Sequence, residues 1–153
     1  MSKISFAKSY IKNSVKVLAV VLIALLCLRV YGDWNIAQEI NRPQTQTSLK
    51  SNFDRHYNYT ELFVWESQHL NFTYETIQRN TNPVDILNYG KGRCGEFAIL
   101  YVALCEANGY DARFVDSILG DHEWAQVNIN GTWIHVDPLI PICTNGIGKP
   151  HLF

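Results

Sequence analysis

The dipeptide Asn130-Gly131 constrains the fold of this chain more than any other short segment. It separates two runs, Glu123–Ile129 and Thr132–Asp137, in which apolar residues alternate with polar ones. Both residues of a two-residue hairpin turn adopt positive φ, and Asn-Gly is among the pairs that tolerate this best. The pattern therefore predicts two antiparallel strands, in a register that places Ala125 opposite Val136.

The same register predicts which side chains share each face of the hairpin, because side chains alternate along a strand. Ala125 and Val127 lie on a face that is apolar or nearly so. The other face carries polar and aromatic side chains, and on it His122 and Asp137 become diagonal neighbours within hydrogen-bonding reach. The spacing alone leaves open which of the two faces is covered by the rest of the fold.

A longer helix is predicted to begin at Cys94, directly after the glycine-rich loop Asn88–Gly95, and to run to about Asn108. Gly109 supplies the usual stop signal. The apolar residues of this segment recur at three- and four-residue steps, as expected for the central helix of a core: Phe97, Ala98, Tyr101, Val102, Leu104 and Cys105.

Shorter elements are predicted around this helix. Their order, helices before an antiparallel sheet, indicates the α+β fold class, with the Cys94 helix packed against the sheet. Residues 33–58 have no sustained apolar period, and we expect a polar stalk or irregular lead-in there, followed by one domain over residues 59–153. The shorter elements are helices over Thr60–Leu70, Thr73–Arg79 and Pro83–Leu87 and a strand over Ala112–Ile118.

Residues 1–32 predict a hydrophobic N-terminal helix with a membrane role. Twelve uninterrupted apolar residues, Val17–Leu28, lie between Lys16 and Arg29. About 20 residues are needed to span a bilayer, although flanking basic side chains can extend a short span. Three alternatives stay open: an uncleaved anchor, which we favour, a cleaved signal peptide, and a buried helix of a soluble protein.

The distribution of charge predicts which side of a membrane the domain occupies. Four lysines precede the apolar run and one arginine follows it, a pattern that favours a cytoplasmic N-terminus. We therefore expect a single-pass protein with its domain on the extracytoplasmic side. All 14 acidic residues but only 8 of the 13 basic ones follow Gly32, which argues against nucleic acid as a partner.

Cys94 is the best candidate nucleophile in the chain. The N-terminus of a helix stabilises a thiolate through unpaired N–H groups and the helix dipole. An imidazole can pair with such a thiolate and later protonate a leaving group, and a carboxylate can orient the imidazole. His122 and Asp137 suit these two roles. Asp121 is the alternative carboxylate, whereas Cys105, within the apolar stripe, is expected to be structural.

Three separated motifs resemble the transglutaminase-like superfamily in order and spacing. They are GRCGEF around Cys94, DHEW around His122, and WIHVDP around Asp137, and they look closest to peptide N-glycanases and their prokaryotic relatives. The resemblance covers about residues 60–138. It implies a papain-like α+β fold in which Cys94 is the nucleophile, His122 the base and acid, and Asp137 the residue that orients the imidazole.

The leading hypothesis is a thiol-dependent hydrolase or acyltransferase that acts on peptide or amide bonds of a peptide or protein substrate, with proteolysis favoured. The alternative is a non-catalytic, membrane-tethered binding domain with the same fold. No Cys-x-x-Cys pair precedes Cys94 and no acidic calcium loop is evident, so we expect neither a metal nor a cofactor. Trp65 and Gln68 are weak candidates to complete an oxyanion hole with the Cys94 N–H group. A Cys₂His₂ metal site could be formed only by four widely separated residues, Cys94, His122, His135 and Cys143.

Overall fold

A computed structural model describes residues 3–74, 79–117 and 122–137, with side chains from Ser14 onward. The chain divides into two compact units, Met1–Asn35 and Ile36–Phe153. The elements follow one another as α1 (Lys3–Ile40), α2 (Pro43–Lys50), α3 (Tyr59–His69), β1 (Asn71–Phe72), α4 (Pro83–Tyr89), β2 (Lys91–Gly92), α5 (Cys94–Ala107), β3 (Ala112–Asp116), β4 (Glu123–Ile129) and β5 (Thr132–Val136).

The first unit consists of the greater part of α1. The stretch Ser14–Ile40 is long and apolar enough to cross a membrane, with a mean hydropathy of 2.2 in its apolar window. A signal sequence near an N-terminus has the same length and composition. None of the apolar window is buried among the described residues. The predicted apolar N-terminal helix is therefore present.

Residues 36–50 differ from the irregular stalk that the sequence predicts for residues 33–58. They form the end of α1 and all of α2, and α2 packs against α5. Ile36, Ile40 and Leu49 are at most 6% exposed and belong to the main hydrophobic cluster. The stalk expectation was wrong here because these few apolar residues, although separated by polar ones, meet on the side of the helices that faces the core.

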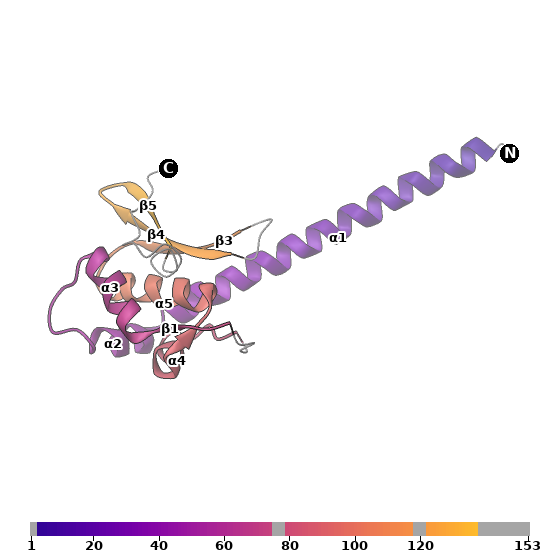
Figure 1. Cartoon of the computed structure of the whole chain (residues 1–153). Helices are drawn as coiled ribbons and strands as arrows, with labels where there is room; N and C mark the ends of the chain where they lie inside the picture. Colours follow the sequence, from indigo (N-terminus) through magenta and orange to yellow (C-terminus); the bar gives the residue numbers. More distant parts are fainter. Residues whose placement is uncertain (1–2, 75–78, 118–121, 138–153) are drawn as a thin grey trace. The chain divides into compact units, whose positions relative to one another are not determined.

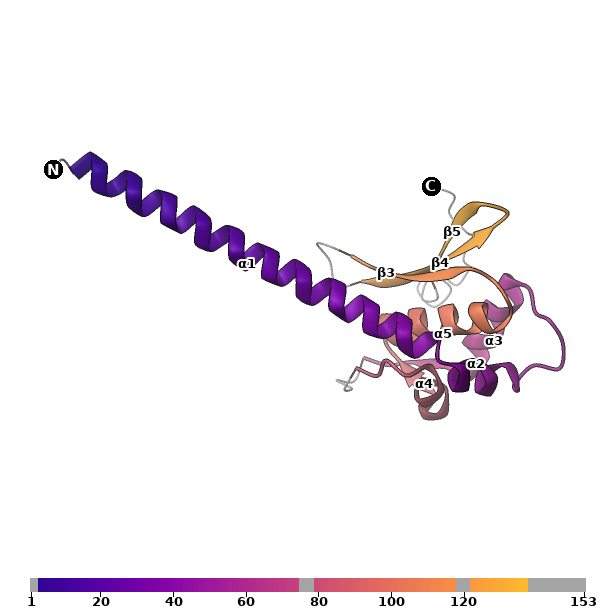
Figure 2. The ribbon, with the colours of Figure 1, turned by 180° about the vertical axis from the view of Figure 1, so that it is seen from behind.

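Helix α5 lies between two layers of the second unit (Figure 1). Strands β3 and β4 contact it on one side, and α2, α3 and α4 contact it elsewhere. The view from behind shows the same order of layers (Figure 2). The α5 side chains from Phe97 to Cys105 are almost entirely buried, as expected for a helix that is apolar all round. The predicted central helix is confirmed, together with its stop at Gly109, which has a φ of 84°.

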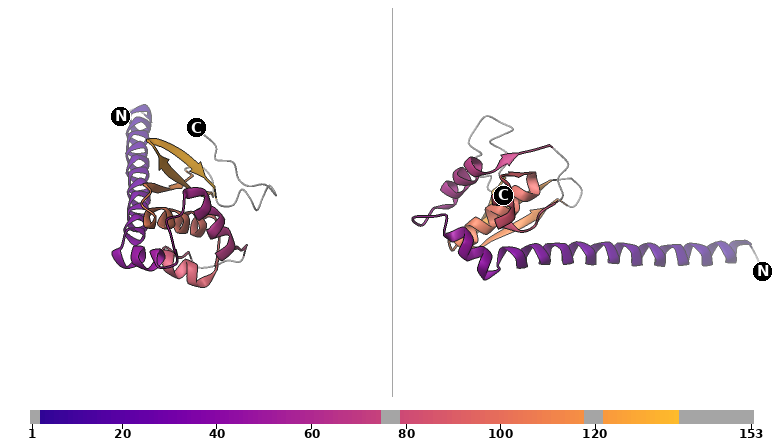
Figure 3. Two further views of the ribbon diagram at one scale, coloured as in Figure 1. Left: turned by 90° about the vertical axis from the view of Figure 1, so that its left-hand side faces the viewer. Right: turned by 90° about the horizontal axis from the view of Figure 1, so that it is seen from below.

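The antiparallel sheet has the strand order β3-β4-β5. Ala125 pairs with Val136, and Ile129 pairs with Thr132, which is the predicted register. The turn residues Asn130 and Gly131 both have positive φ, 54° and 85°. The apolar face with Ala125 and Val127 is buried, so α5 covers this face of the sheet, as seen from two further directions in Figure 3.

The helices α3 and α4 each begin directly after a capping asparagine. The Asn58 side chain accepts hydrogen bonds from the N–H groups of Thr60 and Glu61, and Asn82 caps the start of α4 in the same way. The helix expected over Thr73–Arg79 is not seen at Thr73, Tyr74 or Arg79, and residues 75–78 lie outside the described part of the chain. Instead, β1 pairs in parallel with β2, just ahead of Cys94.

Candidate active site

Cys94 is the first residue of α5, and a buried glutamate fixes the backbone on which it lies. Glu96 is 3% exposed. One of its carboxylate oxygens accepts a hydrogen bond of 3.0 Å from the N–H of Arg93, and the other accepts one of 3.2 Å from the N–H of Asn80. Glu96 thereby joins the start of α5 to the loop before α4.

The Cys94 thiol donates a hydrogen bond to Glu123, with 3.8 Å between Sγ and Oε2. Glu123 is the first residue of β4, and its carboxylate rests against Gly95 in the first turn of α5. A Cβ atom added at Gly95 would lie 2.1 Å from Glu123 Oε2. The absence of a side chain at this position is what allows the carboxylate to approach the start of the helix.

Arg79 is the cationic partner of the Glu123 carboxylate. Its Nη2 lies 2.6 Å from Glu123 Oε1, and the two side chains are 49% and 14% exposed. Burial raises the pKa of the Glu123 carboxyl above its ordinary value, and the charge of nearby Asp116 adds to this, while Arg79 acts in the opposite direction. The Arg79 guanidinium also lies over the Phe114 ring, 5.8 Å from its centroid.

His122 and Asp137 form the second feature of the site. The distance from His122 Nε2 to Asp137 Oδ2 is 2.6 Å, and the Asp137 side chain is only 9% exposed. His122 directly precedes β4, and its carbonyl accepts a hydrogen bond of 3.0 Å from the N–H of Ser117. Asp137 directly follows β5. The diagonal pair expected from the hairpin register is therefore present as a hydrogen bond.

The three predicted residues belong to two neighbouring contacts. Cys94 contacts Glu123 of β4, on the face of the sheet that α5 covers. His122, the residue before Glu123 in the chain, is hydrogen-bonded to Asp137. Successive side chains of a strand point to opposite faces. The direct pairing of the Cys94 thiol with the His122 imidazole stays a prediction.

Two of the other candidate residues, Cys105 and His135, have packing contacts that account for their positions. Cys105 is fully buried, and burial raises the pKa of its thiol far above the ordinary value, as expected of a core residue. The His135 ring packs against Trp124, with centroids 5.3 Å apart. Asp121 and Cys143 lie outside the described residues, so the alternative carboxylate and the four-residue metal set are not tested.

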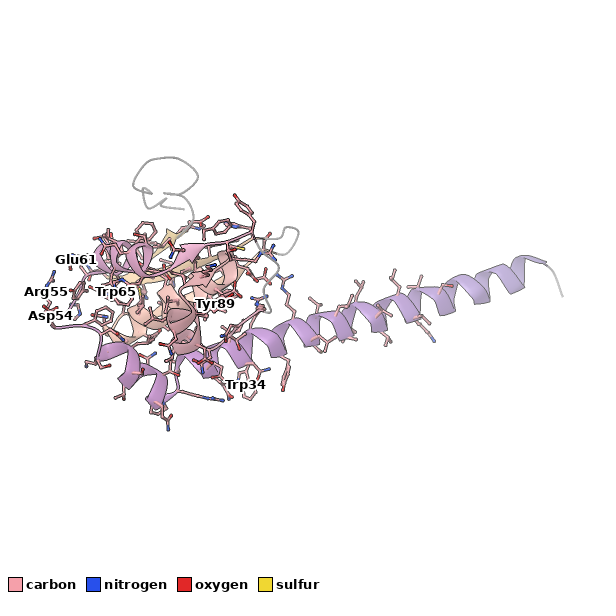
Figure 4. All side chains as sticks on the ribbon, turned by 60° about the horizontal axis from the view of Figure 1, so that its bottom comes forward. Trp34, Asp54, Arg55, Glu61, Trp65 and Tyr89 are labelled. Carbon is pink, nitrogen blue, oxygen red and sulfur yellow. The ribbon has the colours of Figure 1, made fainter. Side chains whose placement is uncertain are left out.

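Trp65, one of the two oxyanion candidates, packs against other aromatic side chains. Its ring stacks on His69 at 3.8 Å and meets the edge of Phe53. Figure 4 shows it on the same side as Arg55 and Glu61, which form an ion pair of 2.7 Å. Gln68 is exposed on α3. These contacts assign Trp65 a packing role, and they leave the oxyanion partner of Cys94 open.

Glu123 and Arg79 are site residues that sequence reasoning missed. The signal for Glu123 was a carboxylate placed on the otherwise apolar face of the hairpin, in line with Ala125 and Val127. A carboxylate on a buried face of a sheet needs a cationic partner or hydrogen bonds to offset the loss of hydration. Arg79 gave no comparable signal, because the segment that carries it was expected to be helical.

The comparisons with known proteins agree on one family. Residues 35–138 match the family model of the transglutaminase-like superfamily. Several similar proteins are peptide-N(4)-(N-acetyl-beta-glucosaminyl)asparagine amidases. The relative from Gallus gallus is 32% identical over 131 residues, which is 84% of this chain and 18% of the relative. The relative from Drosophila melanogaster is 50% identical over 50 residues, 31% of this chain and 8% of its own length.

A solved structure shows the same fold. It is a proposed cysteine protease from Cytophaga hutchinsonii, with a TM-score of 0.52 and 22% sequence identity, over 72% of this chain and 45% of that one. This chain thus spans less than half of the solved protein and at most a fifth of the two amidases above. The predicted papain-like α+β fold is confirmed.

Proposed function

Because this chain belongs to the transglutaminase-like superfamily, we propose that it is a thiol-dependent hydrolase or acyltransferase of amide bonds, with Cys94 as its nucleophile. In this proposal His122 is the general base and acid, and Asp137 orients it. The order of the three residues along the chain supports these roles: a cysteine at a helix start is followed by a histidine just before one strand and an aspartate just after the strand paired with it.

The observation that carries the proposal is the 2.6 Å hydrogen bond between His122 and Asp137. An ionised carboxylate only accepts hydrogen bonds, so the hydrogen in this contact belongs to Nε2 of His122. In the neutral ring, Nδ1 is then the basic nitrogen that receives the thiol proton. The nearly buried Asp137 also stabilises the imidazolium that this proton transfer creates.

The proposed reaction has two halves. The Cys94 thiolate attacks the carbonyl carbon of the amide, the C–N bond breaks, and the departing amine takes the proton from the His122 imidazolium. This leaves an acyl group on sulfur as a thioester. A water molecule, or an amine in acyl transfer, then gives a proton to His122 as it attacks the thioester, and the carboxylic acid or new amide leaves while the thiolate re-forms.

The substrate class is proposed from the comparisons together with the chemistry. The relatives carry the name of an amidase, and the structural neighbour carries that of a protease, so an amide bond in a peptide or protein is the common element. We favour hydrolysis of peptides over acyl transfer, because water is the most abundant acceptor for a thioester.

An acyl-enzyme experiment tests this function. The full chain in mild detergent is incubated with p-nitrophenyl acetate, and peptide mass spectrometry then locates the acetyl group. We expect an acetyl thioester on Cys94, none on the buried Cys105, and slower acetylation in His122→Ala. The Cys94→Ala variant is the control for acetylation elsewhere. Acetylation of Cys94 no faster than that of a free model thiol, such as N-acetylcysteine in the same buffer, would refute the proposal.

One observation favours the second candidate function, a non-catalytic, membrane-tethered binding domain. The Cys94 thiol is placed to donate its hydrogen to the Glu123 carboxylate, a contact that favours the protonated sulfur over the thiolate. A binding domain would retain the fold and the buried Glu96 without requiring a reactive thiol. The acetylation experiment separates the two functions, since a binding domain forms no acyl-enzyme faster than the chemistry of a free thiol allows.

We further propose that the apolar helix is an uncleaved anchor and that the domain lies on the extracytoplasmic side. The length and hydropathy of Ser14–Ile40 support a span. The lysines ahead of it support a cytoplasmic N-terminus. Since Ile36 and Ile40 belong to the core of the second unit, the globular domain is proposed to begin close to the end of α1.

A further inference from the structure

We propose that Glu123 restrains the Cys94 nucleophile and that neutralising the Glu123 carboxylate releases it. This inference rests on the proposed function of Cys94 and adds a residue that controls it. Its starting point is the position of the carboxylate, with one oxygen 3.8 Å from the sulfur of Cys94 and the other 2.6 Å from Arg79.

The restraint follows from electrostatics. A carboxylate that accepts the S–H hydrogen bond stabilises the protonated thiol, and its negative charge opposes the thiolate, which would lie only a few ångströms away. The same carboxylate occupies the start of α5, where the helix dipole would otherwise favour a thiolate. Both effects keep the proton on Cys94 while Glu123 is ionised.

The charged groups around Glu123 make it sensitive to its surroundings. Arg79 is the cation in contact with it. Asp116 is paired with Glu123 across the sheet, and Glu96 lies in the first turn of α5; the charges of both oppose ionisation of Glu123. His122 is its neighbour in the chain. Protonation of the carboxyl, or a cationic group of a substrate that pairs with it, would remove the negative charge beside Cys94.

Gly95 supports this interpretation independently. A helix tolerates alanine in its first turn at least as well as glycine, so helix formation does not require glycine at this position. The requirement comes from Glu123, whose oxygen lies 2.1 Å from the place of a Cβ atom. The chain thus keeps a space for the carboxylate beside its candidate nucleophile.

The test is the pH dependence of Cys94 alkylation by iodoacetamide, read for each cysteine by mass spectrometry on the full chain. Glu123→Gln keeps the size of the side chain and removes the charge, and we expect the pH midpoint for Cys94 to fall by about one unit. Gly95→Ala should displace the flexible carboxylate and lower the midpoint, as Glu123→Gln does.

The midpoint in Glu123→Gln decides the proposal. An unchanged or higher midpoint in that variant would overturn the restraint. Protection of the buried Cys105 in each variant reports that the domain is folded, and Gly95→Ala provides a second readout if Glu123→Gln does not fold. A midpoint that shifts as expected without any acetyl-enzyme would refute the catalytic function and still support the restraint.

Discussion

His122 and Asp137 lie at the open ends of two paired strands, and a hydrogen bond of 2.6 Å between Nε2 and Oδ2 joins them. The residues flank the hairpin on either side, fifteen positions apart in the chain. The geometry of the Asn130-Gly131 turn therefore determines the position of a proposed catalytic pair at the other end of the strands.

Replacing the carboxylate of this pair should affect chemistry more than folding. We expect Asp137→Asn to lower thiol-dependent turnover about 10²-fold or more, because the amide has no charge to stabilise the imidazolium. The rate of acetyl release from Cys94 measures this effect. Asp121→Asn is the matched control, and a larger loss there than in Asp137→Asn would show that the wrong carboxylate was assigned.

The two cysteines of α5 should differ in reactivity. With limiting iodoacetamide, we expect Cys94 to be alkylated well before Cys105, which is fully buried and whose thiol pKa burial raises. In His122→Ala the labelling of Cys94 should move to higher pH, because the imidazolium that favours the thiolate is gone. In urea the two sites should react alike. Equal rates for the two cysteines in the folded chain would contradict the assignment of Cys94 as nucleophile.

Glu66 should make the stability of the domain fall as the pH rises. It is 1% exposed, its Oε1 has no hydrogen-bond partner among the described residues, and burial raises its pKa well above the ordinary value. From about pH 4.5 upward the unfolded chain releases this proton while the folded chain keeps it. Stability then declines by up to about 1.4 kcal/mol per pH unit until the raised pKa is reached.

Urea-unfolding curves of Glu66→Gln across pH measure this contribution. The variant should lack that decline and should gain on the natural chain as the pH rises. Glu61→Gln, on the same helix, is the control, because the contribution of Glu61 to stability should depend on pH in the opposite direction. Its hydrogen bond with Arg55 lowers its pKa, so its contribution is present above pH 4.5 and is lost as the pH falls. Parallel curves for Glu66→Gln and the natural chain would show that Glu66 is not buried.

Leu49→Ala should destabilise the domain as a core substitution does. Leu49 is fully buried, and removing most of its side chain should cost about 2–5 kcal/mol in the free energy of unfolding. Thr47→Ala, on the exposed side of the same short helix, should change it by less than about 0.5 kcal/mol. Similar values for both variants would place α2 outside the folded domain.

The orientation of the anchor can be tested on cells. Protease added to intact cells or to sealed right-side-out vesicles should digest the domain, because the lysine distribution favours a cytoplasmic N-terminus. Lysed vesicles and a cytoplasmic marker protein are the controls. Full protection of the domain in sealed vesicles, with digestion after lysis, would reverse the proposed topology.

The elements that the sequence predicted well are those with local causes. The Asn130-Gly131 turn determines the register of its hairpin, and the apolar residues after Cys94 require a buried helix. Each signal lies within a few residues of the structure it specifies. The resemblance in three motifs then supplied the fold class.

The parts that were not predicted depend on partners that are distant in the chain. Residues 36–50 look polar, and only their contact with α5 reveals that Leu49 is a core residue. Glu123 fits the strand pattern, and its relation to Cys94, 29 residues earlier, follows from how β4 meets the start of α5. No local pattern contains either contact.

The close approach of Glu123 to Gly95 should also be visible in evolution. The two positions share one space, so a member of the family with a side chain at the position of Gly95 should carry a smaller or differently directed residue at that of Glu123. Substitutions at the two positions should therefore covary. A family member with alanine at the first position and glutamate at the second would have to hold its carboxylate elsewhere, and its cysteine would be free of the constraint found in this chain.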